Sequence, residues 1–160
     1  VAVADFEDIS LDSGVIPSDR MSEVLQALLQ RQAGGRLRVI SGEAVRAALR
    51  SRGYTPGDLV SPSRAAEVAG MVGANWLVTG RWTHLRVVSI SVPEGPGTPP
   101  TRQGDAFAYA VIEIRVFDAS ARRVLFRDSF TGHANGGDYN SLLFAATEAL
   151  YFAAIQITRL

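Results

Sequence analysis

The sequence predicts an α+β fold: a mixed five-stranded sheet with helices packed on it, in the order β-α-β-α-α-β-β-β-α. Residues 73–92 form a long run of β-branched and aromatic side chains, which is typical of a central strand. Three short amphipathic helical patterns precede this run, and two strand patterns and one strongly apolar helix follow it. Because a helical crossover separates the first two strands and the last three meander, we expect both parallel and antiparallel pairs.

The composition is that of one folded domain spanning residues 1–160. Sixteen arginines balance sixteen acidic residues, so the net charge of zero gives no electrostatic reason to expect nucleic acid or an anionic membrane surface as a partner. No cysteine is present, which excludes disulfides, thiol catalysis and cysteine-ligated metals. Since Val1 begins in the middle of a strand pattern, we expect a targeting segment to precede it.

Each helix is predicted from apolar residues at helical spacing, with a capping residue before them, and three of the helices end at glycine. Residues 93–105 contain four prolines and three glycines, so they are expected to form a mobile loop between two strands. The predicted strands are 1–6, 37–40, 73–92, 106–117 and 123–134, and the predicted helices lie between Ser18 and Gly34, between Ser41 and Gly53, between Ser61 and Gly73, and over 139–158.

Several short segments carry a resemblance to a known group of proteins. Residues 1–6 are a predicted strand that ends in the acidic–aromatic pair Asp5-Phe6. Residues 18–29 lie in the first predicted helix, which precedes the strand predicted at 37–40. Residues 73–80 read Gly-Ala-Asn-Trp-Leu-Val-Thr-Gly, and residues 114–125 hold an Arg-Val-Phe-Asp hairpin pattern. These patterns resemble bacterial envelope proteins of the curli-secretion-channel type, the amino-terminal domain of TolB, and lipoprotein activators and assembly factors that share their anticodon-binding-domain-like fold.

The resemblance has departures that restrict what it implies. Ala121 stands where the hairpin usually has glycine, and no long segments follow Thr83 or Arg127 to form membrane-inserting hairpins. The resemblance therefore implies a soluble periplasmic domain and not a pore. It implies an accessory or assembly role without catalytic residues or cofactors, at the outer membrane only through a lipid anchor outside this chain.

Three sets of residues could carry chemistry, and each has a simpler explanation. Four acidic residues near the first strand lack the spacing of a calcium loop, so solvation of a loop explains them better than a metal. The glycine-rich residues 132–138 lack the lysine of a P-loop, and a turn with an Asp138 cap explains them better than phosphate binding. The two histidines, His84 and His133, have no acid and nucleophile at a recognisable spacing. The acidic residues are Asp5, Glu7, Asp8 and Asp12.

The last helix is the most informative segment about function. Its apolar residues extend nearly all round, so it is either a core helix buried on two sides or a helix that also faces a partner. Trp76 and Trp82 have an even separation and share one strand face, where core packing is the expected role. We expect contacts with a second copy or another envelope protein at the last helix and the 93–105 loop, through Phe144, Tyr151, Phe152, Ile155, Pro96, Pro99, Pro100 and Arg102.

The leading hypothesis is therefore a non-enzymatic envelope accessory protein that acts by self-association or by binding a partner. An auxiliary subunit of an envelope transport system is an alternative on the same fold. A small phosphate-binding, nucleotide-binding or hydrolytic domain that uses residues 132–138 is the alternative from a different class.

Overall fold

The sheet is organised around one long strand, as the sequence predicts. The computed structural model describes residues 1–10, 16–92 and 102–160, with backbone only at 90–92 and 102–105. The elements are β1 (Ala2–Val3), β2 (Glu7–Asp8), α1 (Ser18–Ala33), α2 (Gly42–Arg52), the 3-10 helix η1 (Pro56–Val60), α3 (Pro62–Met71), β3 (Trp76–Val92), β4 (Arg102–Asp118), β5 (Arg123–Asn135) and α4 (Tyr139–Ile157). β1 and β2 pair in parallel with one edge of β3, and β4 and β5 continue from its other edge as an antiparallel meander.

The predicted α+β class with a mixed five-stranded sheet is confirmed, but several strands differ from prediction. The first strand, predicted over residues 1–6, is β1 over Ala2–Val3 only. Residues 37–40 are not a strand and contribute only one parallel bridge, between Ile40 and Ala2, because β1 beside them is only two residues long. Glu7–Asp8 forms β2 instead of a loop, since β3 extends beyond β1 and offers its edge to the next residues of the chain. Residues 102–105 belong to β4, so the predicted loop 93–105 ends earlier, and residues 93–101 lie outside the described residues.

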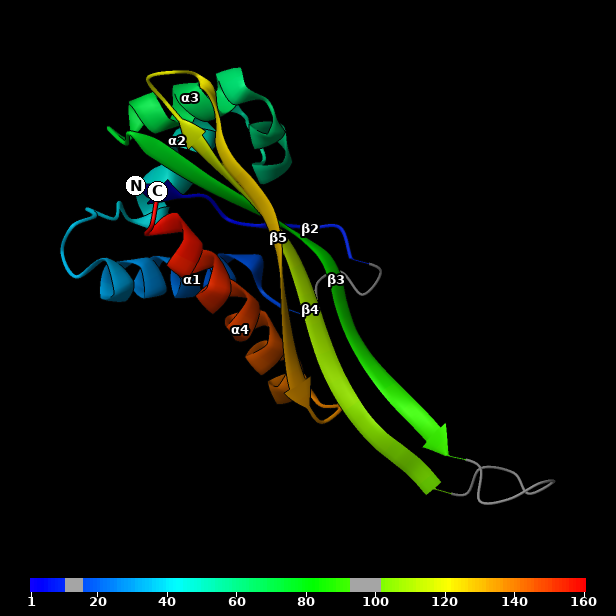
Figure 1. Cartoon of the computed structure of the whole chain (residues 1–160). Coiled ribbons are helices and arrows are strands. Elements are labelled where there is room, and N and C mark those ends of the chain that lie inside the picture. The colour runs from blue at the N-terminus through cyan, green and yellow to red at the C-terminus, as the bar shows by residue number, and fades with distance from the viewer. Residues whose placement is uncertain (11–15, 93–101) are drawn as a thin grey trace.

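Helices cover both faces of the sheet at one end (Figure 1). α1 and α4 pack on one face and α2, η1 and α3 on the other. Buried and partly buried residues alternate along β4 over residues 107–116, and the buried set is apolar and lies on the α1/α4 face. The next residue, Phe117, faces the α2/α3 side together with Leu77 of β3. The buried set of β4 is Ala108, Ala110, Ile112, Ile114 and Val116.

The ends of α2 follow the predicted signals, and those of α1 and α3 follow them in part. Gly34 and Gly53 adopt left-handed backbone conformations directly after α1 and α2, as the glycine stops predict. Ser41 caps α2 by accepting a hydrogen bond from the backbone N–H of Ala44. In α1, Pro17 occupies the capping position and no side chain caps the helix. In α3, the predicted cap Ser61 makes no side-chain capping hydrogen bond, and the helix ends at Met71 with Val72, not Gly73, directly after it.

The β3–β4 hairpin extends beyond the helices and beyond the end of β5 (Figure 1). β5 ends at Asn135, opposite Phe107, so the rest of the hairpin is a two-stranded ribbon within the described residues. α4 is long and apolar enough to cross a membrane by length and composition alone. Here one face of α4 is buried against the sheet, which is the arrangement of a core helix.

Candidate interaction surface

α4 begins where the sequence predicts, at an aspartate cap. The Asp138 carboxylate accepts hydrogen bonds from the backbone N–H (2.8 Å) and the hydroxyl (2.6 Å) of Ser141. These two hydrogen bonds, the hydroxyl first, lower the pKa of Asp138 below its ordinary value, so the cap is ionised at neutral pH. The N-terminus of α4 is therefore stabilised by a local cap, formed between Asp138 and Ser141.

A glycine in β5 allows α4 to lie unusually close to the sheet. A Cβ atom on Gly132 would overlap the carbonyl oxygen of Ala145 and stand 2.6 Å from the backbone nitrogen of Ala149. The helix side of this contact consists of small residues, so helix backbone and strand backbone approach directly. A hydrogen bond of 2.7 Å from the His133 N–H to the Glu148 carboxylate also joins the two elements. The inner face of α4 therefore packs closely against β5 and is joined to it by this hydrogen bond.

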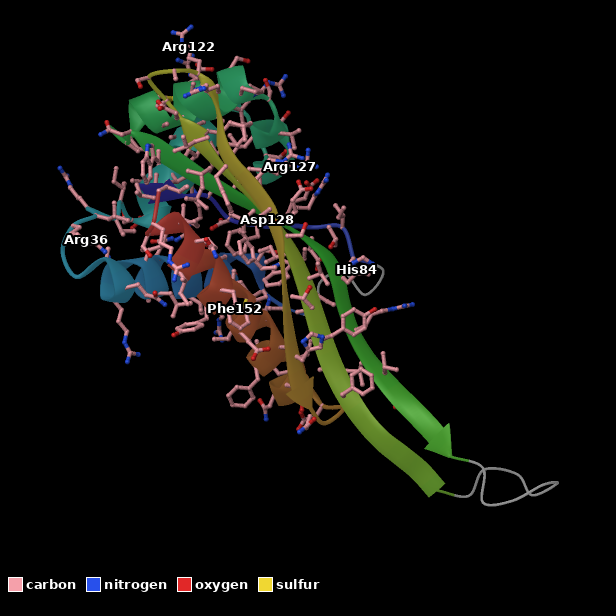
Figure 2. All side chains as sticks on the ribbon, in the orientation of Figure 1. Arg36, His84, Arg122, Arg127, Asp128 and Phe152 are labelled. Atoms are coloured by element: carbon pink, nitrogen blue, oxygen red, sulfur yellow. The ribbon has the colours of Figure 1, made fainter. Side chains whose placement is uncertain are left out.

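The outer face of α4 exposes aromatic side chains. Phe144 is 70% exposed, Tyr151 47% and Phe152 44%, while Ile155 is partly buried. The rings of Tyr151 and Phe152 meet edge to face with centroids 6.0 Å apart. These four residues are spaced along one side of the helix, and we call them the α4 outer stripe (Phe152 is labelled in Figure 2). The structure thus places the predicted contact residues of α4 at the surface, and their role as contacts stays a prediction.

A hollow adjoins this stripe at the neighbouring helix. Tyr151 and the α1 residues Leu28, Arg31 and Gln32 line a depression of about 330 Å³. α1 and α4 are packed against each other, so the stripe and the hollow form one continuous surface. A side chain from a second molecule could insert between the two helices here.

The contact residues predicted in the 93–105 loop have no described surface. Pro96, Pro99 and Pro100 lie outside the described residues. Arg102 is not in a loop, because its backbone pairs with Val92 at the start of β4. Only the α4 part of the predicted contact set therefore has a described surface.

Sequence reasoning missed a charged cluster on the opposite face of the sheet. The mostly buried carboxylate of Glu113 receives hydrogen bonds from Arg115 and Arg127, each at 2.8 Å, and lies 3.7 Å from Arg81. Burial alone would raise the pKa of Glu113, but the hydrogen bonds and charges of Arg127 and Arg115 outweigh it and lower the pKa. The alternation of charged residues in β4 was the available signal. The pairing of β4 with β3 and β5 supplies the other two arginines.

The other candidate sites are occupied by structural contacts. Asp5 accepts hydrogen bonds from Ser22 and Arg46, Asp8 accepts from Ser10, and Asp12 lies outside the described residues. Within the described part of the chain, no group of three histidine, aspartate or glutamate side chains could hold a metal ion.

The histidines and tryptophans have the structural roles that the sequence favours. His84 and His133 are exposed on the sheet face opposite α4, and His84 stacks on Tyr109 with centroids 6.3 Å apart. Trp76 and Trp82 share one face, as predicted. Trp82 is fully buried, whereas Trp76 is partly buried at the edge of the core. The glycine-rich residues 132–138 serve strand–helix packing and the Asp138 cap.

The comparisons with known proteins bear on the fold. No protein-family profile and no curated protein sequence matches this chain. Solved structures do match. A lipoprotein from Neisseria meningitidis superposes with a TM-score of 0.63 at 14% identity, over 99% of this chain and 97% of that one. LpoB of E. coli gives a TM-score of 0.58 at 14% identity.

The chain has the fold of these two proteins. The match to LpoB covers 85% of this chain but only 57% of the LpoB chain. A PelC dodecamer from Paraburkholderia phytofirmans superposes with a TM-score of 0.50 at 17% identity, over 94% of this chain and 82% of that one. The expected bacterial envelope type of fold is consistent with these matches, and the specific likeness to the curli channel and TolB stays a prediction.

Proposed function

We propose that this chain is a non-enzymatic accessory protein of the bacterial envelope that acts by self-association through the α4 outer stripe. The observation that carries the proposal is the exposure of Phe144, Tyr151 and Phe152 on a helix whose opposite face is locked into the core. Large aromatic side chains contribute most of the apolar area at protein interfaces, and their clustering on one helix face is typical of a contact surface.

A second copy of the chain fits this surface. In a two-fold contact the same stripe meets itself, so apolar side chains oppose apolar side chains without any need for complementary charge. The one carboxylate along the stripe, Glu148, is already engaged by the N–H of His133. The formal net charge of zero means that two copies do not repel each other at long range.

The structural likenesses support the proposed location in the bacterial envelope and the proposed self-association. A protein of the same fold is a lipoprotein, and PelC, also of this fold, forms a dodecamer. These likenesses support an envelope location, and we propose that the protein lies in the periplasm, tethered to the outer membrane by a lipid anchor outside this chain. Its partner there is a further copy of itself.

Light scattering across a concentration series tests the proposal. We expect an oligomer whose mass rises with concentration. The double variant Tyr151→Glu/Phe152→Glu should weaken association at least about tenfold, because two charges replace apolar side chains at the contact. Far-UV circular dichroism and thermal unfolding would show that the variant remains folded.

Met71→Glu is the matched control, since Met71 is 45% exposed at the end of α3, away from the stripe. It should leave the mass unchanged. A chain that is monomeric at every concentration, or an oligomer that the two variants affect equally, would contradict self-association through α4.

A further inference from the structure

A second hollow, distant from the α4 stripe in the sequence and lined by other elements, lies where β1 and β3 begin. It has a volume of about 410 Å³, which is within the range of small-molecule sites. Its walls come from the first residue of the chain, from the segment that links α1 to α2 (Figure 2 labels Arg36 on it), and from the turn before β3. The lining residues are Val1, Arg36, Leu37, Arg38, Ile40, Gly73, Asn75 and Trp76.

The apolar part of this hollow is held in place by the sheet. Trp76 is partly buried and packs on the edge of the α1/α4-side core. The Ile40 N–H donates to the Val1 carbonyl at 2.8 Å, which holds the linking segment against β1. Leu37 and Ile40 are likewise partly buried. The hollow thus offers an aromatic ring and aliphatic side chains on a fixed backbone.

The polar part is cationic. Arg36 and Arg38 are exposed, and no acidic residue lines the hollow. In the described part of the chain, six other arginines form ion pairs with carboxylates, but Arg36 and Arg38 form none. The Nε of Arg36 donates to the Ala33 carbonyl at 3.2 Å, which restrains the side chain and leaves its two terminal amino groups for a ligand.

We infer that this hollow binds a small amphiphilic anion, with an apolar ring or chain against Trp76 and a carboxylate or phosphate at Arg36 and Arg38. Guanidinium groups match both kinds of oxyanion with paired hydrogen bonds, and they stay charged at every physiological pH. The inference does not rest on self-association, because none of the lining residues belongs to the α4 outer stripe.

The test uses naphthalene-2-carboxylate as the probe and its neutral amide as the matched comparison. The chain has two tryptophans, so its ¹H–¹⁵N spectrum contains two indole signals, which Trp76→Phe assigns. We expect the carboxylate to shift the Trp76 signal saturably and to leave that of the fully buried Trp82 unchanged. Naphthyl phosphate in a parallel titration shows which oxyanion binds more tightly, and tighter binding of either one supports the anion site.

The double variant Arg36→Gln/Arg38→Gln should weaken binding of the carboxylate about tenfold and leave that of the amide unchanged, since only the charge-assisted hydrogen bonds are removed. Arg20→Gln/Arg50→Gln is the control, because it removes the same charge from exposed positions on α1 and α2. Equal affinity for the carboxylate and the amide, equal effects of the two double variants, or a Trp76 signal that does not move would each overturn the inference.

Discussion

Substitution of Gly132 by alanine should destabilise the protein by about 3 kcal/mol or more, at the upper end of the values for overpacked cores. The added Cβ would overlap the carbonyl oxygen of Ala145 and stand 2.6 Å from the backbone nitrogen of Ala149, where ordinary contacts begin at 3.4 Å. Both obstacles are helix backbone, so no side-chain rotation can relieve the overlap. α4 must move away from β5, and its buried face then loses contacts along its length.

Urea unfolding measures this effect directly. We expect a lower midpoint with an unchanged slope, because the same surface is exposed on unfolding. Gly70→Ala in α3 is the control, since a Cβ there meets nothing within 4 Å and its backbone is helical. That variant should be neutral or more stable by up to about 1 kcal/mol. A Gly132→Ala protein within about 0.5 kcal/mol of the parent, which is the range of ordinary surface substitutions, would refute the close approach of α4 and β5.

Two further predictions concern stability. Glu113→Gln should cost about 2 kcal/mol at neutral pH, between the values for exposed and buried pairs, because Arg115 and Arg127 lose their shared carboxylate. The pKa of Glu113 is lowered in the folded state, so its ion pairs stabilise fully above the unfolded-state pKa and are lost as the pH falls through the folded-state value. The stability difference between parent and variant should therefore shrink in acid, and a pH-independent difference would contradict the ion-pair explanation. Arg122→Gly should raise the melting temperature, because Arg122 has a φ of 50° and glycine removes a strain of about 1 kcal/mol. Ala121→Gly is the control, and it should lower the melting temperature because Ala121 has a negative φ. A higher melting temperature for Ala121→Gly than for Arg122→Gly would contradict the hairpin geometry.

Much of the fold is predictable because its signals are local. The period-two burial of β4 follows from residues two apart, such as Ile112 and Ile114. The stops at Gly34 and Gly53 follow from the freedom of glycine to adopt a positive φ, and the Asp138 cap from a side chain three residues before its partner. The apolar residues of α4 likewise predict a helix with more apolar surface than one core face needs.

Other features depend on contacts between distant segments, which local patterns do not encode. The residues 37–40 resemble a strand, yet one bridge forms because the neighbouring β1 is too short to pair further. The sequence pattern predicts a turn at residues 132–138, and only the packing of α4 shows that Gly132 lacks a side chain so that a helix backbone can lie against it. The cluster around Glu113 needs the registers of three strands at once.

The sequence by itself determined the helices α1 to α4, the long strands β3 to β5, the fold class, and the aromatic residues of α4 that are in excess of a core stripe. Only the tertiary structure decided which of those aromatic residues reach the surface, because burial depends on where β5 and α1 lie against the helix. It also brought Arg36, Arg38 and Trp76 together around one hollow, although about forty residues separate the arginines from the tryptophan. Chain neighbours set the local conformation, whereas sheet register and helix placement set every surface at which this protein can meet another molecule.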